Sequence, residues 1–146
     1  MRKQRSALRS SASLSLLGRG KNRYSSGGKG VRERRLSQTL AALKGNAITV
    51  VIDETGDRKK GKRTDYVARQ YLGSIGKVDR GIVSVNAYGV YENITFPLLF
   101  KVFKPKGTLR QGEKYQTKIE LAVEILKELI EFGFKVDLVL ADSLYG

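Results

Sequence analysis

Two aspartates follow apolar segments that are typical of buried β-strands. Asp53 ends the segment AITVVID, residues 47–53, and Asp142 ends KVDLVLAD, residues 135–142. If the two segments are parallel neighbours, both carboxylates lie at the edge of the sheet where ligands bind in open α/β folds. Carboxylates held close together raise each other's pKa unless a cation lies between them. The pair therefore predicts a divalent metal site, while the simpler interpretation that each Asp caps a turn or a helix stays open.

The residue types that this chain lacks restrict the chemistry further. It contains no Cys and no His, which excludes thiolate or imidazole zinc sites, cysteine nucleophiles and every His-based catalytic triad. A metal bound here would have oxygen ligands, which Mg²⁺ and Mn²⁺ prefer. We therefore expect Mg²⁺ (or Mn²⁺) as the cofactor, with Asp53 and Asp142 as metal ligands and catalytic residues. Such ions can activate water or a hydroxyl for attack on a phosphodiester.

A second motif, GDRKKGK at residues 56–62, satisfies the phosphate-binding pattern G-x-x-x-x-G-K. The next residue is Arg63, however, so the hydroxyl of Thr64 comes one place late. A phosphate-binding loop should also be followed by a helix that points its N-terminus at the phosphate. The following segment, TDYVARQYLGSIG, does not have a helical pattern. We therefore favour a charged loop over a nucleotide site.

The charge of the chain indicates a polyanionic partner. The net charge is +14, from 28 Lys and Arg against 14 Asp and Glu, and no segment approaches the length of about 20 apolar residues that a membrane span needs. Residues 1–30 are rich in Ser, Gly, Arg and Lys and predict a disordered basic tail, although their composition also overlaps with organelle transit peptides. Residues 31–146 form the predicted domain. The candidate nucleic-acid-binding residues are Arg58, Lys59, Lys60, Lys62, Arg63, Arg69, Lys104 and Lys106.

The elements around the two aspartates follow from hydrophobic periodicity. After a helix that ends near Gly45, residues 47–53 predict a buried strand, and residues 81–92 and 93–104 predict a hairpin in which Pro97 marks an edge or a bulge. Because a helix precedes the last strand, residues 135–142, that strand should run parallel to a neighbour. The sequence therefore predicts an α/β fold with a mixed sheet, in the order strand, hairpin pair, helix, strand.

The helix before the last strand has the clearest signals. Thr117 and Glu120 form the capping-box pattern T-x-x-E, and Gly133 predicts the end of the helix. We expect its acidic residues to face water. The expected buried stripe is Ile119, Ala122, Val123, Leu126, Leu129 and Ile130.

Three segments together resemble bacterial insertion-sequence transposases of the DDE superfamily: IDETGDRKKGKRTDYVARQYLGSIGKVDRGIVSVNAYGV, TFPLLFKVFKP and LVLADSLYG. The resemblance covers roughly residues 34–146. It implies an RNase H-like catalytic domain in which three acids bind two Mg²⁺ or Mn²⁺ ions. The first acid matches Asp53 in D-E-T-G, and the second matches Asp142 in D-S-L-Y-G. The third, usually a Glu on a helix well downstream, is absent from these 146 residues, so we expect a truncated transposase whose sheet is incomplete at the C-terminus.

The resemblance also implies the reaction and the partners. The parent activity is hydrolysis of DNA at transposon ends, followed by transfer of the 3′-hydroxyl to target DNA, and we expect the fragment to be inactive alone. The partners are DNA and, for the full-length parent, a possible homo-oligomer, with no membrane. The expected location is the cytoplasm, in association with the nucleoid. The alternative is a non-catalytic basic DNA- or RNA-binding protein, in which replacing Asp53 or Asp142 leaves metal binding unchanged.

Overall fold

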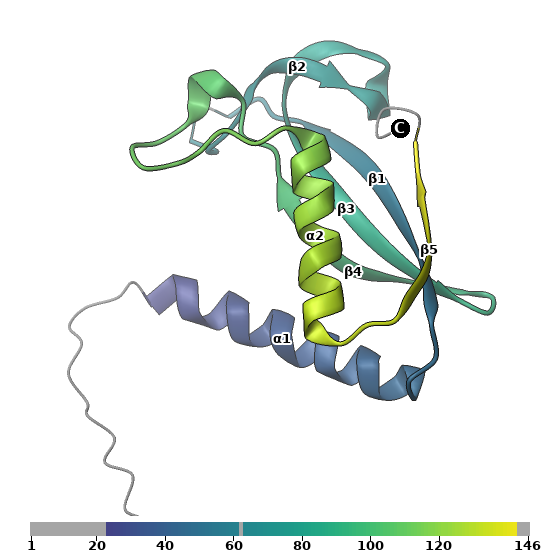
Figure 1. Cartoon of the computed structure of the whole chain (residues 1–146). Helices are drawn as coiled ribbons and strands as arrows, with labels where there is room; N and C mark the ends of the chain where they lie inside the picture. Colours follow the sequence, from purple (N-terminus) through teal and green to yellow (C-terminus); the bar gives the residue numbers. More distant parts are fainter. Residues whose placement is uncertain (1–22, 62, 143–146) are drawn as a thin grey trace, which may run out of the picture.

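The computed structural model describes residues 23–61 and 63–142, with side chains from residue 28 onward. These residues form an α/β unit with a five-stranded sheet and two α-helices (Figure 1). The elements are α1 Arg23–Leu43, β1 Ile48–Arg58, β2 Ala68–Leu72, the 3₁₀ turn η1 Gly73–Ile75, β3 Lys77–Tyr91, β4 Ile94–Val102, the 3₁₀ turn η2 Lys106–Thr108, α2 Lys118–Phe132 and β5 Val136–Ala141.

The sheet is mixed, as the sequence predicts. Its order is β2-β3-β1-β5, and β4 pairs with β3. Strand β1 runs antiparallel to β3 and parallel to β5. The last strand, which follows the crossover helix α2, is therefore parallel to a neighbour, as expected. The predicted elements occur in the expected order, with one additional strand, β2, between the first strand and the hairpin pair. Strand β2 was not predicted, and β3 begins at Lys77 rather than at residue 81 because it also pairs with β2.

The β3–β4 hairpin contains the irregularity expected at Pro97. Ala87 pairs with Leu99 and the next residue, Tyr88, pairs with Pro97, so Leu98 is the extra residue of a bulge. Proline has no N–H to donate to a neighbouring strand, which explains why the ladder is interrupted here. Arg35 of α1 donates hydrogen bonds to the carbonyls of Pro97 and Leu98, so the bulge also anchors the first helix.

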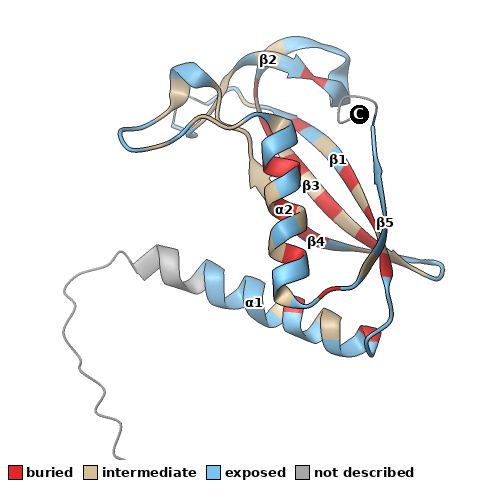
Figure 2. Cartoon of the chain, in the orientation of Figure 1, coloured by how far each residue is buried: buried red, intermediate tan, exposed pale blue. Residues whose placement is uncertain are grey.

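The hydrophobic core lies between the two helices and one face of the sheet (Figure 2). Alternate residues of β1 point into it, because side chains of a strand alternate between faces. The opposite face is only half-buried or exposed within the described residues, as at Val51 and Asp53. The core residues are Leu36, Leu43, Ile48, Val50, Ile52, Val85, Ala87, Leu98, Leu99, Leu121, Ala122, Ile125, Leu129 and Phe134.

Helix α2 begins and ends as expected but buries a different face. Thr117 Oγ1 accepts from Glu120 N, the Glu120 carboxylate accepts from Thr117 N, and Gly133 ends the helix with φ +113°. The expected buried stripe is wrong in part: Ile119, Val123 and Ile130 are exposed, and the buried residues are Leu121, Ala122, Ile125 and Leu129. Apolar residues cover most of the circumference of this helix, so periodicity alone did not identify the face that packs on the sheet.

Helix α1 is longer than expected. It begins at Arg23, so residues 23–30, which the sequence analysis assigns to the disordered tail, are helical. Leu36 and Leu43 of this helix are buried, Leu40 packs against the core, and Ala41 is exposed. Residues 1–22 lie outside the described residues, so the prediction of disorder there stays a prediction.

Strand β5 forms the exposed end of the sheet. Five of its six residues are exposed, including Leu138, Val139 and Leu140 (Figure 2). An open strand edge with exposed apolar side chains is a surface on which further polypeptide can pack. Among the helices of the described part, none is long and apolar enough to cross a membrane.

Candidate active site

The two aspartates lie next to each other on neighbouring strands: Asp142 directly follows β5, whereas Asp53 lies within β1, which continues to Arg58 rather than ending at residue 53 as expected. The last register pair between the parallel strands β1 and β5 joins Ile52 to Ala141, and the following residues are Asp53 and Asp142. Neighbouring strands lie about 4.8 Å apart, so the two backbones hold these side chains at adjacent positions. Both residues are exposed. The parallel arrangement on which the metal-site prediction depends is therefore confirmed.

The donors at this position fit part of a divalent metal site. Two carboxylates supply the hard oxygen ligands that Mg²⁺ and Mn²⁺ prefer. Asp53 Oδ1 also accepts a hydrogen bond of 2.8 Å from the N–H of Glu54, which fixes the direction of that carboxylate. Within the part of the chain that the structure describes, no three acidic residues are grouped so that they could hold a metal. The arrangement thus fits two ligands of a larger set.

A small polar network lies beside Asp53 on the exposed face of the sheet. Asn86 of β3 is the direct register partner of Asp53. Its Nδ2 donates to Thr55 Oγ1 at 3.0 Å, and its Oδ1 accepts from Ser84 Oγ at 3.3 Å. Sequence reasoning missed these residues because their proximity to Asp53 depends on the β1–β3 register. The period-two alternation of residues 81–92 places Asn86 and Ser84 on one, more polar face, but it does not place them opposite Asp53.

Glu54 points to the other face of β1, as the alternation of a strand requires. Its Oε2 lies 2.6 Å from Lys118 Nζ at the start of α2, and the two side chains are only 17% and 24% exposed. Glu54 Oε2 is buried and has no hydrogen-bond partner, so the ion pair with Lys118 offsets the cost of burying its charge. Lys118 Nζ also lies 5.5 Å from the centre of the Phe103 ring. Glu54 is therefore an internal partner of Lys118 rather than a competitor of Asp53 for metal.

The basic candidates divide into two groups. Three of them form ion pairs within the chain, with the following N–O distances: Arg58–Asp79 at 2.8 Å, Lys59–Asp57 at 3.0 Å and Lys104–Glu113 at 2.7 Å. No ion pair is found among the described residues for Lys60, Arg63, Arg69 or Lys106. Lys62 lies outside the described residues. Because no ion pair with a carboxylate offsets the positive charges of this second group, they can attract an external anion more strongly.

The charged segment after β1 is not a phosphate-binding loop of the nucleotide type. Strand β1 continues to Arg58, and the regular element that follows the turn is β2 rather than a helix. Within the described residues, no helix follows this segment directly, as expected from its sequence. Tyr66, with φ +61°, lies just before β2.

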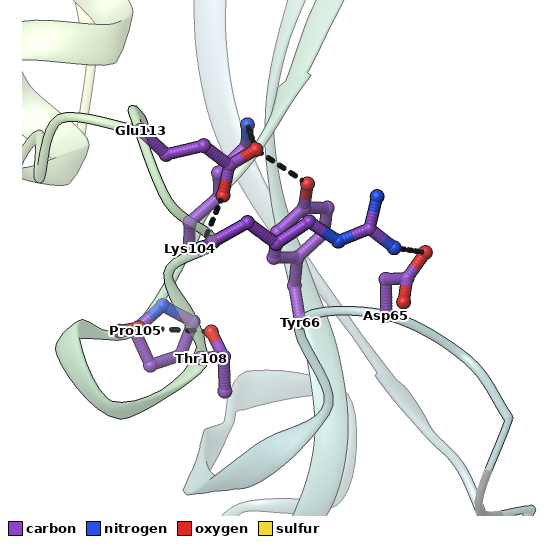
Figure 3. Close-up of polar contacts among 7 residues, drawn as sticks. Asp65, Tyr66, Lys104, Pro105, Thr108 and Glu113 are labelled. Atoms are coloured by element: carbon purple, nitrogen blue, oxygen red, sulfur yellow. Dashed lines mark hydrogen bonds and ion pairs between the residues drawn. The ribbon is translucent and has the colours of Figure 1, made fainter.

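A polar cluster connects this segment to the loop after β4 (Figure 3). Glu113 Oε1 accepts from Tyr66 Oη and from Lys104 Nζ, both at 2.7 Å, and Glu113 Oε2 accepts from the N–H of Arg110 at 3.0 Å. Arg110 Nη2 reaches Asp65 Oδ2 at 2.5 Å. The hydrogen bonds from the Arg110 N–H, Lys104 and Tyr66 stabilise the ionised Glu113 carboxylate and lower its pKa to about 2, and the bond from the Arg110 N–H is the largest cause. The ionised Glu113 thus holds two basic loops together.

Glu113→Gln is expected to destabilise the protein in a pH-dependent way. Because the pKa of Glu113 falls from 4.5 to about 2 on folding, its contribution is complete above pH 4.5 and is lost as the pH falls toward 2. The difference in Tm between wild type and Glu113→Gln should therefore shrink over this range in thermal denaturation. Glu131→Gln, at an exposed position of α2, is the control, and a constant Tm difference for Glu113→Gln would contradict the assignment.

Comparisons with known proteins agree with the resemblance seen in the sequence. Residues 26–146 match the family model described as DDE superfamily endonuclease. Over 116 residues, 80% of this chain, the sequence is 57% identical to the "Probable transposase for insertion sequence element IS701" of Microchaete diplosiphon. The chain spans 30% of the length of that relative. No solved structure matches the chain. Because the family model matches residues 26–146, which is most of the chain, the chain belongs to the DDE superfamily endonuclease family.

Proposed function

We propose that this chain is part of the RNase H-like catalytic domain of an insertion-sequence transposase. The observation that carries the proposal is the register of β1 and β5, in which Asp53 and Asp142 follow the paired residues Ile52 and Ala141. The mixed sheet with a parallel β1–β5 pair supports the RNase H-like assignment. The parent reaction is cleavage of DNA at the ends of the element and transfer of the cut strand to target DNA.

Asp53 and Asp142 are proposed to hold Mg²⁺ or Mn²⁺ through their carboxylate oxygens. When bound, such an ion activates the attacking oxygen and stabilises the charge that develops on a phosphodiester. The Glu54 N–H orients Asp53 by its hydrogen bond, and the polar group of Asn86, Thr55 and Ser84 borders the position of the reacting phosphate. The ion pair of Glu54 with Lys118 lies on the other side of β1 and keeps the charge of Glu54 away from this site.

The 146 residues alone are proposed to bind metal weakly and not to cleave DNA. The family resemblance implies a third carboxylate, and no group of three acids that could hold a metal is found within the described ranges. The exposed apolar residues of β5 support the idea that further polypeptide of the parent packs against this edge. We place the parent, as a DNA-acting enzyme, in the cytoplasm with the nucleoid, and a homo-oligomer is compatible with these features.

We propose DNA contacts for the basic residues that form no ion pair with a carboxylate among the described residues. Ion pairs with neighbouring carboxylates are formed by Arg58, Lys59 and Lys104. Among the described residues, no ion pair is found for the other four, Lys60, Arg63, Arg69 and Lys106. An ion-paired cation attracts a phosphate less strongly, because its partner repels the same anion. We therefore rank the unpaired group first as phosphate contacts. Lys62 stays a candidate from the sequence alone.

The test is a Mn²⁺ titration of the full chain followed by electron paramagnetic resonance. We expect weak binding that Asp53→Asn and Asp142→Asn each reduce by about tenfold or more, because each removes one charged ligand. Asp137→Asn, which removes an exposed carboxylate of the same strand β5, is the matched control and should leave binding unchanged. If all three variants bind Mn²⁺ like wild type, the metal site is wrong and the non-catalytic basic DNA- or RNA-binding protein becomes the better account.

A further inference from the structure

Two arginines face each other across the β2–β3 hairpin. Arg69 of β2 is the direct register partner of Arg80 of β3, and both are exposed. The next pair on the same face is Tyr71 with Val78, whose side chains are 56% and 53% exposed. Because residues two apart on a strand share a face, these four side chains form one surface, which we call the hairpin face. It combines two positive charges with an aromatic ring.

The pairing of the two arginines does not serve the fold. Like charges directly opposite each other on neighbouring strands are destabilising. The nearest acidic residue in the strand, Asp79, points to the other face and pairs with Arg58 at 2.8 Å. No ion pair with either Arg69 or Arg80 occurs among the described residues. An external anion would offset the repulsion, so the hairpin face is complementary to a negatively charged ligand.

The shape of the surface agrees with its charge. A shallow open groove at the hairpin is lined by Arg69, Lys77 and Arg80, together with Asp79, Val67, Ala68 and Val78, and Tyr71 lies outside this lining. Three cations in a groove, with an exposed aromatic ring on the same hairpin, suit a single nucleic-acid strand, because phosphates contact the cations and a base stacks on the ring. A duplex would engage the cations but not the ring, because its bases are already stacked on each other.

The hairpin face continues toward the two aspartates. On β3 the residues that share a face with Arg80 are Ile82, Ser84 and Asn86, and Asn86 is the register partner of Asp53. Six residues of strand cover about 20 Å. In Figure 1, β2 lies at the end of the sheet toward which β1 and β5 run. One exposed face of β3 therefore connects the paired arginines to the candidate active site.

We propose that the hairpin face binds a single-stranded segment of DNA that leads away from the position of cleavage. Arg69 and Arg80 contact consecutive phosphates, and an unpaired base stacks on Tyr71. The identity of the strand as DNA rests on the proposed function. The binding itself needs neither the metal nor Asp53 and Asp142, so it can be tested separately.

The experiment measures binding of the full chain to a short fluorescent single-stranded oligonucleotide in EDTA over a range of salt concentrations. Arg69→Gln/Arg80→Gln is compared with Lys127→Gln/Lys135→Gln, which removes two exposed positive charges from α2 and from the segment that follows it. Both double variants keep the Lys- and Arg-rich N-terminal segment, so its contribution to binding is the same in each. We expect the arginine variant to weaken binding at least tenfold more than the control. It should also reduce the salt slope by about 1.4, or about 0.7 for each lost phosphate contact.

Tyr71 supplies a second, independent readout. Tyr71→Ala should weaken single-strand binding about tenfold and remove the fluorescence quenching of a 2-aminopurine base in the oligonucleotide, whereas Tyr71→Phe should keep both. Binding of a duplex of the same sequence should not respond to Tyr71→Ala. Equal losses for the arginine and lysine variants, or equal behaviour of Tyr71→Ala and wild type, would overturn the proposal.

Two controls separate this proposal from its alternatives. Arg80→Gln should leave the Tm unchanged or raise it, because it removes a like-charge contact, so that lost binding is not a result of unfolding. Asp137→Asn, which removes an exposed carboxylate of β5 outside the hairpin face, should bind the oligonucleotide in EDTA like wild type. A failed Mn²⁺ titration with intact hairpin binding would reject the metal site alone, and the reverse pattern would reject the hairpin face alone.

Discussion

Ile125→Ala is expected to destabilise the protein by about 3 kcal/mol, within the range of 2–5 kcal/mol typical for removing a buried Ile side chain down to Cβ. Ile125 is 0% exposed and belongs to the hydrophobic core cluster between the helices and the sheet, together with Val50 and Leu98. Helix α2 is also the crossover that leads into β5, so loosening it affects the strand that carries Asp142. The measurement is equilibrium unfolding in urea, where the midpoint should fall with little change in slope.

The matched control for this substitution lies on the same helix. Ile130→Ala removes the same atoms from a side chain that is 58% exposed, so we expect a change within about 0.5 kcal/mol. The contrast tests which face of α2 packs on the sheet, the point on which hydrophobic periodicity was partly wrong. Equal losses at the two positions would mean that Ile130 is covered in solution and that the described packing of α2 is incomplete.

The parts of the fold that sequence reasoning predicted are those with local signals. Thr117 and Glu120 stand three residues apart and cap α2 by themselves, and the alternation in β3 needs no distant partner. The parallel direction of β5 followed from one topological rule, because a helix between two strands of a sheet returns the second strand parallel to a neighbour; the structure shows that this neighbour is β1. The positions of Asp53 and Asp142 then followed from the ends of the apolar runs.

The features that were missed depend on contacts between distant residues. Strand β2 contains Arg69, Gln70 and Tyr71 in a row, and only its pairing with β3 makes it a strand. The ion pair of Arg58 with Asp79 joins residues on two strands, so the sequence did not show that this charge is partly neutralised. Asn86 was placed on a face by alternation, but its position opposite Asp53 is set by the β1–β3 register.

Lys118→Met is expected to destabilise the protein by about 2 kcal/mol. The substitution keeps the length and the apolar part of the side chain but leaves the Glu54 carboxylate, 17% exposed, without its cation at 2.6 Å. Removing one partner of a fully buried ion pair costs about 3–5 kcal/mol, and the remaining exposure of this pair reduces that figure. Urea unfolding at neutral pH provides the measurement.

A double-mutant cycle separates the ion pair from the packing of Lys118. Glu54→Gln/Lys118→Met removes both charges, and we expect it to be within about 1 kcal/mol of wild type, because two matched neutral side chains leave no buried charge unpaired. Glu54→Gln alone should cost less than Lys118→Met, since the flexible lysine can turn its amine toward water. If the double variant is as unstable as Lys118→Met, the loss comes from packing against Phe103 and not from the unpaired carboxylate.

The same double variant also tests the division of roles between neighbouring acids. Glu54 and Asp53 are adjacent in the chain but point to opposite faces of β1, and only Asp53 lies beside Asp142. The variant that lacks Glu54 and Lys118 should therefore bind Mn²⁺ like wild type, while Asp53→Asn should not. A loss of Mn²⁺ binding in the stable double variant would make Glu54 a ligand and would move the metal to the helix-covered side of β1.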